Sequence, residues 1–375
     1  MTVSSSTRSL PGRLLVSACF AQLLTYTLPV SAEIRFDVRT LISDDGSSGI
    51  ADGNLVNGWG VSYGPTGPFW VSANGTGTST VYTVNPITDA TTINSLVVTI
   101  PGTGAVTGQV FNGGSGFNGD RFLFVSEDGT ISGWRGALGT QAEILENNPS
   151  AIFKGGALGT IGSNSYLYAA DFNSGSIHVK GSSGAPSLEG SFTDPNLPSG
   201  YAPFNIQQLA GQLYVAYAKQ LSGSADEDAQ PGFGYVDSYD LNGNFLARIA
   251  SGGSLNAPWG LALAPSSWGE LGGKLLVGNF GDGTINVYDQ TTSTFLGQLL
   301  GADGKALSIP GLWGITPGNG GNAGSPDRLY FAAGPDDETR GQFGVIQPVP
   351  LPPALSLLMS ALTGLYLAVR RKSIK

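Results

Sequence analysis

Residues 274–288 read Lys-Leu-Leu-Val-Gly-Asn-Phe-Gly-Asp-Gly-Thr-Ile-Asn-Val-Tyr, which is an apolar stretch, a glycine-rich turn and a second apolar stretch. The pair Asp282-Gly283 reaches positive φ easily, so the two apolar stretches are expected to form a β-hairpin. Trp259-Gly260-Leu261 predicts a strand before this hairpin, and Phe295–Leu299 predicts another strand after it. Together these stretches predict one antiparallel sheet of four strands.

The same hairpin recurs along the chain, and internal repeats of this length decide the fold of a long chain. Its leading strand occurs six times, about 45–60 residues apart: Phe69–Ala73, Phe122–Ser126, Tyr166–Ala170, Leu213–Tyr217, Lys274–Gly278 and Leu329–Ala333. Its trailing strand follows each time: Thr80–Val84, Thr130–Trp134, Ser176–Val179, Gly234–Tyr239, Thr284–Tyr288 and Gln342–Ile346. An innermost strand precedes the hairpins: Trp59-Gly60-Val61, Trp259-Gly260-Leu261 and Trp313-Gly314-Ile315, with degenerate copies at Phe204-Asn205-Ile206, Val106–Phe111 and Ile152–Gly156.

Six units of four strands, without a helical period, predict an all-β fold that is a six-bladed β-propeller. The 57 glycines agree, because glycine weakens helices but suits short strands joined by tight turns. The last unit, 310–349, is one strand short, and we expect Ile34–Ile42 to complete it and close the ring. The alternatives are an open sandwich and a β-helix, and the latter would need coils of roughly 20–30 residues that are not evident.

The first 32 residues have the three-part plan of a secretory signal peptide. A polar start with Arg8 and Arg13 precedes an apolar stretch, and small residues lead to a cleavage position between Ala32 and Glu33. The competing interpretation is a lipoprotein signal, because Val16-Ser17-Ala18-Cys19 looks like a lipobox. Only about five apolar residues precede Cys19, which is short for the hydrophobic region of such a signal.

Residues 350–375 predict a sorting segment with a short transmembrane helix. The apolar run Ala354–Val369 is close to the length that spans a bilayer, and trailing bases would stay cytoplasmic. A proline-rich motif precedes the run and an arginine cluster follows it: Val349, Pro350, Pro352, Arg370 and Arg371. The arrangement resembles the PEP-CTERM sorting signal, which implies an exosortase-type processing enzyme as partner. A plain C-terminal membrane anchor is the alternative.

The body between the two ends, 33–349, resembles a family of uncharacterised bacterial exported β-propellers related to the NHL type. The motifs that carry the resemblance are Asn54–Gly60, Gly67–Ser72, Asn256–Leu261, Leu276–Gly283, Gly311–Ile315 and Leu329–Pro335. They cover nearly all of 40–346 as a set. The resemblance implies a propeller and an exported setting, in the cell envelope or outside the cell, but it implies no reaction.

The composition excludes several classes of site. Two of the 18 Lys and Arg residues lie in 1–32 and four in 350–375, so the body holds 12 bases against all 27 acids and has a net charge of −15. Such a body repels nucleic-acid phosphates and anionic lipids, and it favours cations or neutral partners. Cys19 and His178 are the single cysteine and histidine, which excludes disulfides and zinc sites with several histidines from the body.

Four oxygen-bearing residues follow the leading strands of the hairpins: Asn74, Glu127, Asp171 and Asn279. If these residues converge on the propeller axis, they form a candidate calcium site, since Ca²⁺ takes six to eight oxygen ligands. Six-bladed lactonase-like propellers hold an axial calcium in this manner, which implies a calcium-dependent hydrolase or lyase as the alternative function. The competing interpretation is that these residues are turn formers, because Asn and Asp favour turns.

Other polar and aromatic residues have simpler interpretations. Asp226-Glu227-Asp228 lies in the Ser- and Gly-rich insertion Leu221–Gly232 and predicts an exposed loop. Asp336-Asp337-Glu338 has the same interpretation, and its place in the last unit leaves a position near the mouth of the axis open. Trp59, Trp259 and Trp313 repeat with the blades and are expected to pack between them rather than stack on sugars.

No catalytic residue stands out, and His178 lies between apolar neighbours like an ordinary strand residue. The sequence therefore predicts a surface- or matrix-associated binding or structural propeller without evident catalysis. Its loops at the blade edges would bind an exopolysaccharide or another surface protein.

Overall fold

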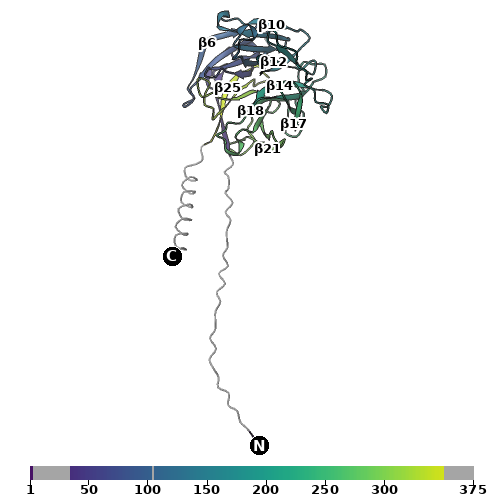
Figure 1. Ribbon diagram of the computed structural model, residues 1–375. Helices are drawn as coiled ribbons and strands as arrows, with labels where there is room; N and C mark the ends of the chain where they lie inside the picture. The colour runs from purple at the N-terminus through teal and green to yellow at the C-terminus, as the bar shows by residue number, and fades with distance from the viewer. Residues whose placement is uncertain (3–33, 104, 350–375) are drawn as a thin grey trace. The chain divides into compact units, whose positions relative to one another are not determined.

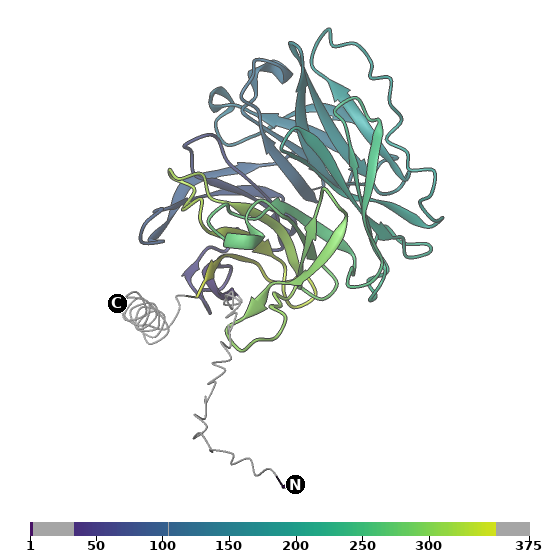
Figure 2. The same cartoon turned by 60° about the horizontal axis from the view of Figure 1, so that its bottom comes forward.

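The computed structural model describes residues 1–2, 34–103 and 105–349, and the strands of this region form six sheets (Figure 1). The sheets follow one another around a common centre in chain order (Figure 2). The protein is therefore an all-β, six-bladed β-propeller, as the repeats predict.

Several predictions about the two ends concern residues outside this described part of the chain. They are the signal peptide with its cleavage position at Ala32 and Glu33, and the sorting residues Pro350, Pro352, Arg370 and Arg371. Val349 is described, and its amide donates to the carbonyl of Arg35 at 2.8 Å. Among the described residues, no helix has the length and hydropathy required to cross a bilayer.

In blades 1 to 5 the strand numbers increase outward from the axis. Blade 1 comprises β3 (Gly58–Ser62), β4 (Phe69–Ala73), β5 (Thr78–Val84) and β6 (Thr91–Thr99). Blade 2 comprises β7 (Val106–Phe111), β8 (Phe122–Ser126), β9 (Thr130–Trp134) and β10 (Glu143–Asn147). Blade 3 comprises β11 (Phe153–Ile161), β12 (Asn164–Asp171) and β13 (Ser176–Gly181).

Blades 4 and 5 repeat the four-stranded plan, and blade 6 is built from both ends of the body. Blade 4 comprises β14 (Tyr201–Leu209), β15 (Gln212–Lys219), β16 (Tyr235–Tyr239) and β17 (Phe245–Ser251). Blade 5 comprises β18 (Pro258–Leu263), β19 (Leu275–Asn279), β20 (Ile285–Asp289) and β21 (Thr294–Gln298). Blade 6 comprises β23 (Leu312–Pro317), β24 (Leu329–Ala333), β25 (Gln342–Pro348) and β1 (Arg35–Ser43), with β2 (Ile50–Ala51) and β22 (Leu300–Gly301) beside β1. Short 3-10 turns occupy η1 (Asn74–Thr76), η2 (Phe117–Gly119), η3 (Gly136–Leu138) and η4 (Gly269–Leu271).

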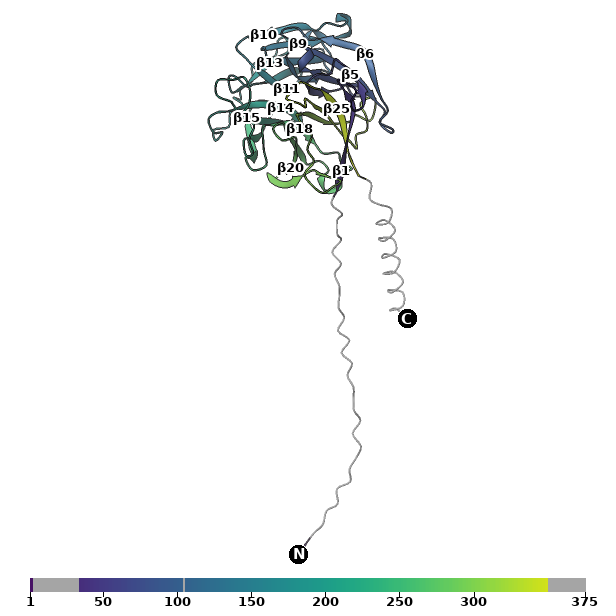
Figure 3. The same ribbon diagram turned by 180° about the vertical axis from the view of Figure 1, so that it is seen from behind.

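The ring closes as the sequence predicts, with β1 as the outer strand of blade 6 (Figure 3). β1 runs antiparallel to β25, from the pair Phe36–Pro348 to the pair Ser43–Gln342. Phe36 and Ile42 are buried, whereas Val38 between them is exposed. A buried carboxylate reinforces the closure: Asp89 of blade 1 binds Arg39 of β1 at 2.8 Å and also binds Arg328 of blade 6.

Glycines of the innermost strands allow neighbouring blades to approach closely near the axis. A Cβ on Gly60 would lie 2.7 Å from the carbonyl oxygen of Thr107 in blade 2. A Cβ on Gly314 would lie 2.5 Å from the carbonyl oxygen of Trp59 in blade 1. Both distances are shorter than atoms tolerate, so these positions exclude every side chain.

Blade 3 departs from the predicted plan, because its sheet has three strands and the expectation of four is wrong for this unit. The residues that follow β13, 182–200, contain Pro186, Pro195 and Pro198. Proline has no amide hydrogen to donate and is poorly tolerated inside a strand ladder. This composition explains why the segment reaches blade 4 without adding a fourth strand.

The closure yields a direct prediction about stability. Replacing Phe36 with alanine should lower the free energy of unfolding by about 3–5 kcal/mol, because a buried ring is lost and a cavity remains. Val38→Ala is the matched control on the same strand, and it should change stability by less than about 0.5 kcal/mol. Urea unfolding of both variants measures the difference, and equal effects would contradict the role of β1.

Candidate functional site at the axial mouth

One end of the axis gathers the connections that carry the polar residues. In each blade the first strand begins where the second strand ends, as in the pairs Gly58–Ala73 and Phe153–Asp171. The turns after the second strands and the connections between blades therefore lie at the same end. We call this end the axial mouth, and it is defined by Asn57, Asn74, Glu127, Lys154 and Glu338.

Aromatic side chains fill the centre of the ring beneath the axial mouth. Trp59 stacks on Trp313 with 3.6 Å between ring centroids, and Trp259 meets both edge-on at 6.0 and 5.7 Å. Phe280 stacks on the other side of Trp313 at 4.1 Å. All three tryptophans are buried, so they are packing residues, although they meet across the axis and not only between neighbouring blades.

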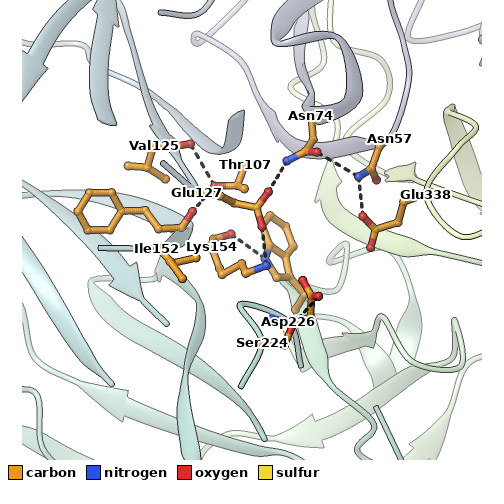
Figure 4. Close-up of polar contacts among 12 residues, drawn as sticks. Asn57, Asn74, Thr107, Val125, Glu127, Ile152, Lys154, Ser224, Asp226 and Glu338 are labelled. Carbon is orange, nitrogen blue, oxygen red and sulfur yellow. Dashed lines mark hydrogen bonds and ion pairs between the residues drawn. The ribbon is translucent and has the colours of Figure 1, made fainter. Parts of the chain in front are cut away.

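A continuous chain of polar contacts links four blades across the axial mouth (Figure 4). The Lys154 ammonium lies 2.5 Å from Oε1 of Glu127, and the Asn74 amide donates to Oε2 of the same carboxylate at 3.0 Å. The Asn57 amide donates to Oδ1 of Asn74 at 3.3 Å and to Oε2 of Glu338 at 2.8 Å. Each carboxylate and amide is thereby fixed in direction.

Lys154 is the buried cation at the centre of this arrangement. A β-bulge between Phe153 and Gly155 takes Lys154 out of the regular strand alternation. Its side chain is only 2% exposed, and its ammonium lies 5.4 Å from the ring centre of Trp59 and 5.9 Å from that of Phe172. A buried ammonium needs a close counter-charge, which explains the short contact with Glu127.

The insertion between β15 and β16 bends toward the axial mouth, so the predicted exposed loop is only partly exposed. Its tip, 221–226, is exposed, but Glu227 is half-buried. Burial raises the pKa of the Glu227 carboxyl to about 7, the Lys154 charge opposes this rise, and the charge of Glu338 adds to it.

The carboxylates at Asp336, Asp337 and Glu338 stand on strained backbone. Their φ angles are 55°, 52° and 64°, a left-handed conformation that non-glycine residues rarely adopt. Burial also raises the pKa of the Glu338 carboxyl, and the nearby charge of Glu127 adds to the rise. Strain of this kind persists where the surrounding structure holds it, and it is common at functional sites.

A cleft of about 470 Å³ opens at the axial mouth beside these residues. Four carboxylates line it, from Asp282, Asp336, Asp337 and Glu338. The ring of Phe280 and the prolines Pro310 and Pro335 supply apolar wall, and Ala229 of the insertion closes one side. The cleft therefore combines negative charge with an aromatic surface.

The four predicted calcium ligands are only partly brought together. Asn74 and Glu127 are hydrogen-bonded to one another, but Glu127 is already engaged by Lys154. Asp171 uses its carboxylate within its own turn, where it accepts from the amides of Ile152, Asn173 and Ser174. The amide of Asn279 donates to Ser254 and Asp282. In the described part of the chain, no group of three or more His, Cys, Asp or Glu residues is arranged to hold a metal.

Sequence reasoning missed Lys154, which is the cation of the site. It lies in the most degenerate copy of the innermost-strand motif, where a bulge breaks the alternation. Asn57 directly precedes the motif Gly58-Trp59-Gly60, and its position before an innermost strand was the available signal.

The fold and the axial mouth define a class of protein: a six-bladed β-propeller whose axis is sealed by aromatic rings and ends in an acidic cleft. No family model matches the chain. It is 30% identical over 364 residues to uncharacterized protein R648 of Acanthamoeba polyphaga mimivirus, which covers 91% of this chain and 87% of that protein. Uncharacterized protein L690 of the same virus is 30% identical over 321 residues, 78% of this chain and 80% of that protein. The chain belongs to the family that includes these two proteins.

Solved structures are similar to the chain in fold. The PQQ-bound form of aldose sugar dehydrogenase from Streptomyces coelicolor matches with a TM-score of 0.48 and 14% identity, over 85% of this chain and 99% of that one. Streptogramin B lyase matches with a TM-score of 0.46 and 12% identity, over 84% and 98%. The WD40 propeller domain of Doa1 matches with a TM-score of 0.46 and 10% identity, over 82% and 96%.

The buried ion pair predicts a strong coupling between two positions. Lys154→Met should lower the free energy of unfolding by about 2 kcal/mol, because Glu127 loses the cation that compensates it. Adding Glu127→Gln should recover part of that loss, with a coupling of at least about 1 kcal/mol between the two changes. A double-mutant cycle by urea unfolding measures it, and additive effects would contradict a direct pair.

The raised pKa of Glu227 predicts how the free energy of unfolding changes with pH. Because the folded-state pKa is raised to about 7 from 4.5, this group stabilises the fold fully below pH 4.5 and progressively less as the pH rises to 7. Glu227→Gln should therefore gain stability relative to the native protein at pH 8, on the order of 1 kcal/mol, and little at pH 4. Urea unfolding at both pH values tests this, with the exposed Glu189→Gln as control.

Proposed function

We propose that this protein is an exported, surface- or matrix-associated binding propeller that holds an organic cation in the cleft of the axial mouth. The observation that carries the proposal is the cleft that both the carboxylates of Asp282, Asp336, Asp337 and Glu338 and the ring of Phe280 line. Amines and guanidinium groups are the ligands that such a surface favours, because they bind carboxylates and aromatic faces alike.

The charge balance of the region supports a cationic ligand. Lys154, the cation of the axial mouth, is already paired with Glu127 and is almost completely buried. The carboxylates in the cleft therefore keep their negative field, within a body whose net charge is −15. A cleft of one charge sign concentrates ligands of the opposite sign.

The aromatic wall supports an organic cation rather than a bare metal ion. Phe280 is held flat by stacking on Trp313, and its partly exposed ring borders the cleft. An aromatic face attracts an ammonium group and also packs against the carbon skeleton that carries it.

A binding role agrees with the placement of the single histidine. His178 is on the third strand of blade 3, where its Nε2 lies 2.7 Å from Glu146. Its imidazole therefore lies against a carboxylate of blade 2 and is not part of the axial mouth. The exported setting rests on the sequence patterns of 1–32 and 350–375, and an exosortase-type enzyme is the proposed processing partner.

Two sources of organic cation fit the cleft, namely an amino sugar of a matrix polysaccharide and a basic side chain of a surface protein. A glucosamine hexamer and a lysine-rich peptide represent the two sources, and calcium chloride represents the metal alternative. Isothermal titration of the full-length protein should show saturable binding of at least one organic probe, weakened by salt. The N-acetylated hexamer, which lacks the charge, should not bind.

Substitutions locate the binding. The triple variant Asp336→Asn, Asp337→Asn, Glu338→Gln should weaken the cationic probe at least about tenfold, since three charges leave the cleft. The control variant Asp37→Asn, Glu189→Gln, Asp303→Asn removes three exposed charges elsewhere and should bind as the native protein does. The proposal fails if neither organic probe binds, if the acetylated hexamer binds equally well, or if both variants behave alike.

A further inference from the structure

The third strand of blade 3 lies at an open sheet edge. In the other blades the third strand lies between two neighbours, as β9 does between β8 and β10. Among the strands that the structure describes, β13 pairs with β12 alone. Half of the main-chain amide and carbonyl groups of an edge strand point away from its one neighbour, so β13 presents a row of them outward.

Burial sets β13 apart from its counterparts. All five residues of β9 are buried, and so are four of the five in β20. In β13, Ile177 is the buried residue, and the remaining residues are partly or fully exposed. The difference is expected if the position of a fourth strand beside β13 is unoccupied.

The segment that follows β13 is fastened to blade 4 and not to this edge. The amides of Gly190 and Phe192 donate to the carbonyls of Asn242 and Gly243, both at 3.0 Å. Asp194 is ion-paired with Arg248 of β17. Within 34–103 and 105–349, no main-chain hydrogen bond joins the residues after Ser182 to β13.

The two faces of β13 differ in chemistry. His178 and Lys180 project on one face, where they lie 2.7 and 2.9 Å from the same carboxylate, Glu146 of β10. Ile177 and Val179 project on the other face and join an apolar cluster with Leu188. One carboxylate thus serves two basic groups, and the opposite face is apolar.

We propose that β13 accepts a fourth strand from a partner protein, by addition of an extended segment in which acidic and apolar residues alternate. Main-chain groups of the segment would complete the ladder, which is how peptides bind exposed sheet edges. Its acidic residues would lie beside Lys180 and its apolar residues beside Val179, because side chains of a strand alternate between faces.

The charges favour a different partner over a second copy of this chain. Pairing β13 with another β13 would bring two Lys180 ammonium groups to the same face of one sheet, and like charges across strands are destabilising. An acidic strand would instead add carboxylates to the face on which Lys180 lies. This strand-binding edge is separate from the axial mouth, so either site can exist without the other.

The test measures hydrogen exchange of the full-length protein with a defined probe. The probe is a capped ten-residue peptide of alternating valine and glutamate. It should slow exchange of the Ser176–Gly181 amides at least tenfold while β9 is unchanged. A peptide with glutamine in place of glutamate should protect at least threefold less, and one with alternate N-methylated amides should not protect.

A charge exchange makes the test specific. Lys180→Glu should abolish protection by the glutamate peptide and gain protection by a lysine version, whereas the exposed control Lys305→Glu should behave as the native protein does. The proposal is overturned if the β13 amides are as slow as those of β9 without any peptide, if the glutamate peptide gives no protection, or if raising the protein concentration alone protects them, which would indicate a second copy.

Discussion

The innermost strands of six blades have to meet at one axis without leaving a void, and the rest of the structure depends on how they do so. Glycine at Gly60 and Gly314 removes the side chains that would hold the backbones apart. Tryptophan in the preceding positions then fills the centre, where Trp59 and Trp313 lie in stacking contact. Small and large residues side by side in one motif thus close the ring, and close packing of this kind is what gives an interior its stability.

This packed centre also explains the chemistry of the axial mouth. A rigid aromatic floor keeps water from one side of Lys154, so its ammonium must be matched by Glu127 and by aromatic faces. Hydrogen bonds through Asn74 and Asn57 then connect Glu127 to Glu338. The carboxylate of Glu338, which lines the cleft, is consequently held in position above this aromatic layer, and a preorganised group binds at a smaller entropic cost.

The repeats made the propeller predictable, because each hairpin can be recognised in the sequence as an apolar strand, a turn and a second apolar strand. Ile34–Ile42 was assigned correctly from its alternation and from the shortage in the last unit. The missing strand of blade 3 was not predicted, since Ile177 and Val179 look like any trailing strand and the prolines come only afterwards. The role of Lys154 was not predicted, because the bulge at this residue breaks the strand alternation from which its direction could be inferred. The burial of Glu227 was not predicted, because it depends on residues of other blades.

The pairing of β1 with β25 bears on the order of events during synthesis. The ribosome makes β1 before the six blades and its partner after nearly all of them, so Phe36 and Ile42 have no ladder to join until residue 348 has emerged. Contacts of such sequence separation are slow to form, because the chain must first lose the entropy of a very large loop. Blade 6 is therefore expected to form last. Until it does, the incomplete ring would expose an unpaired strand at each end, which is the kind of surface that chaperones bind.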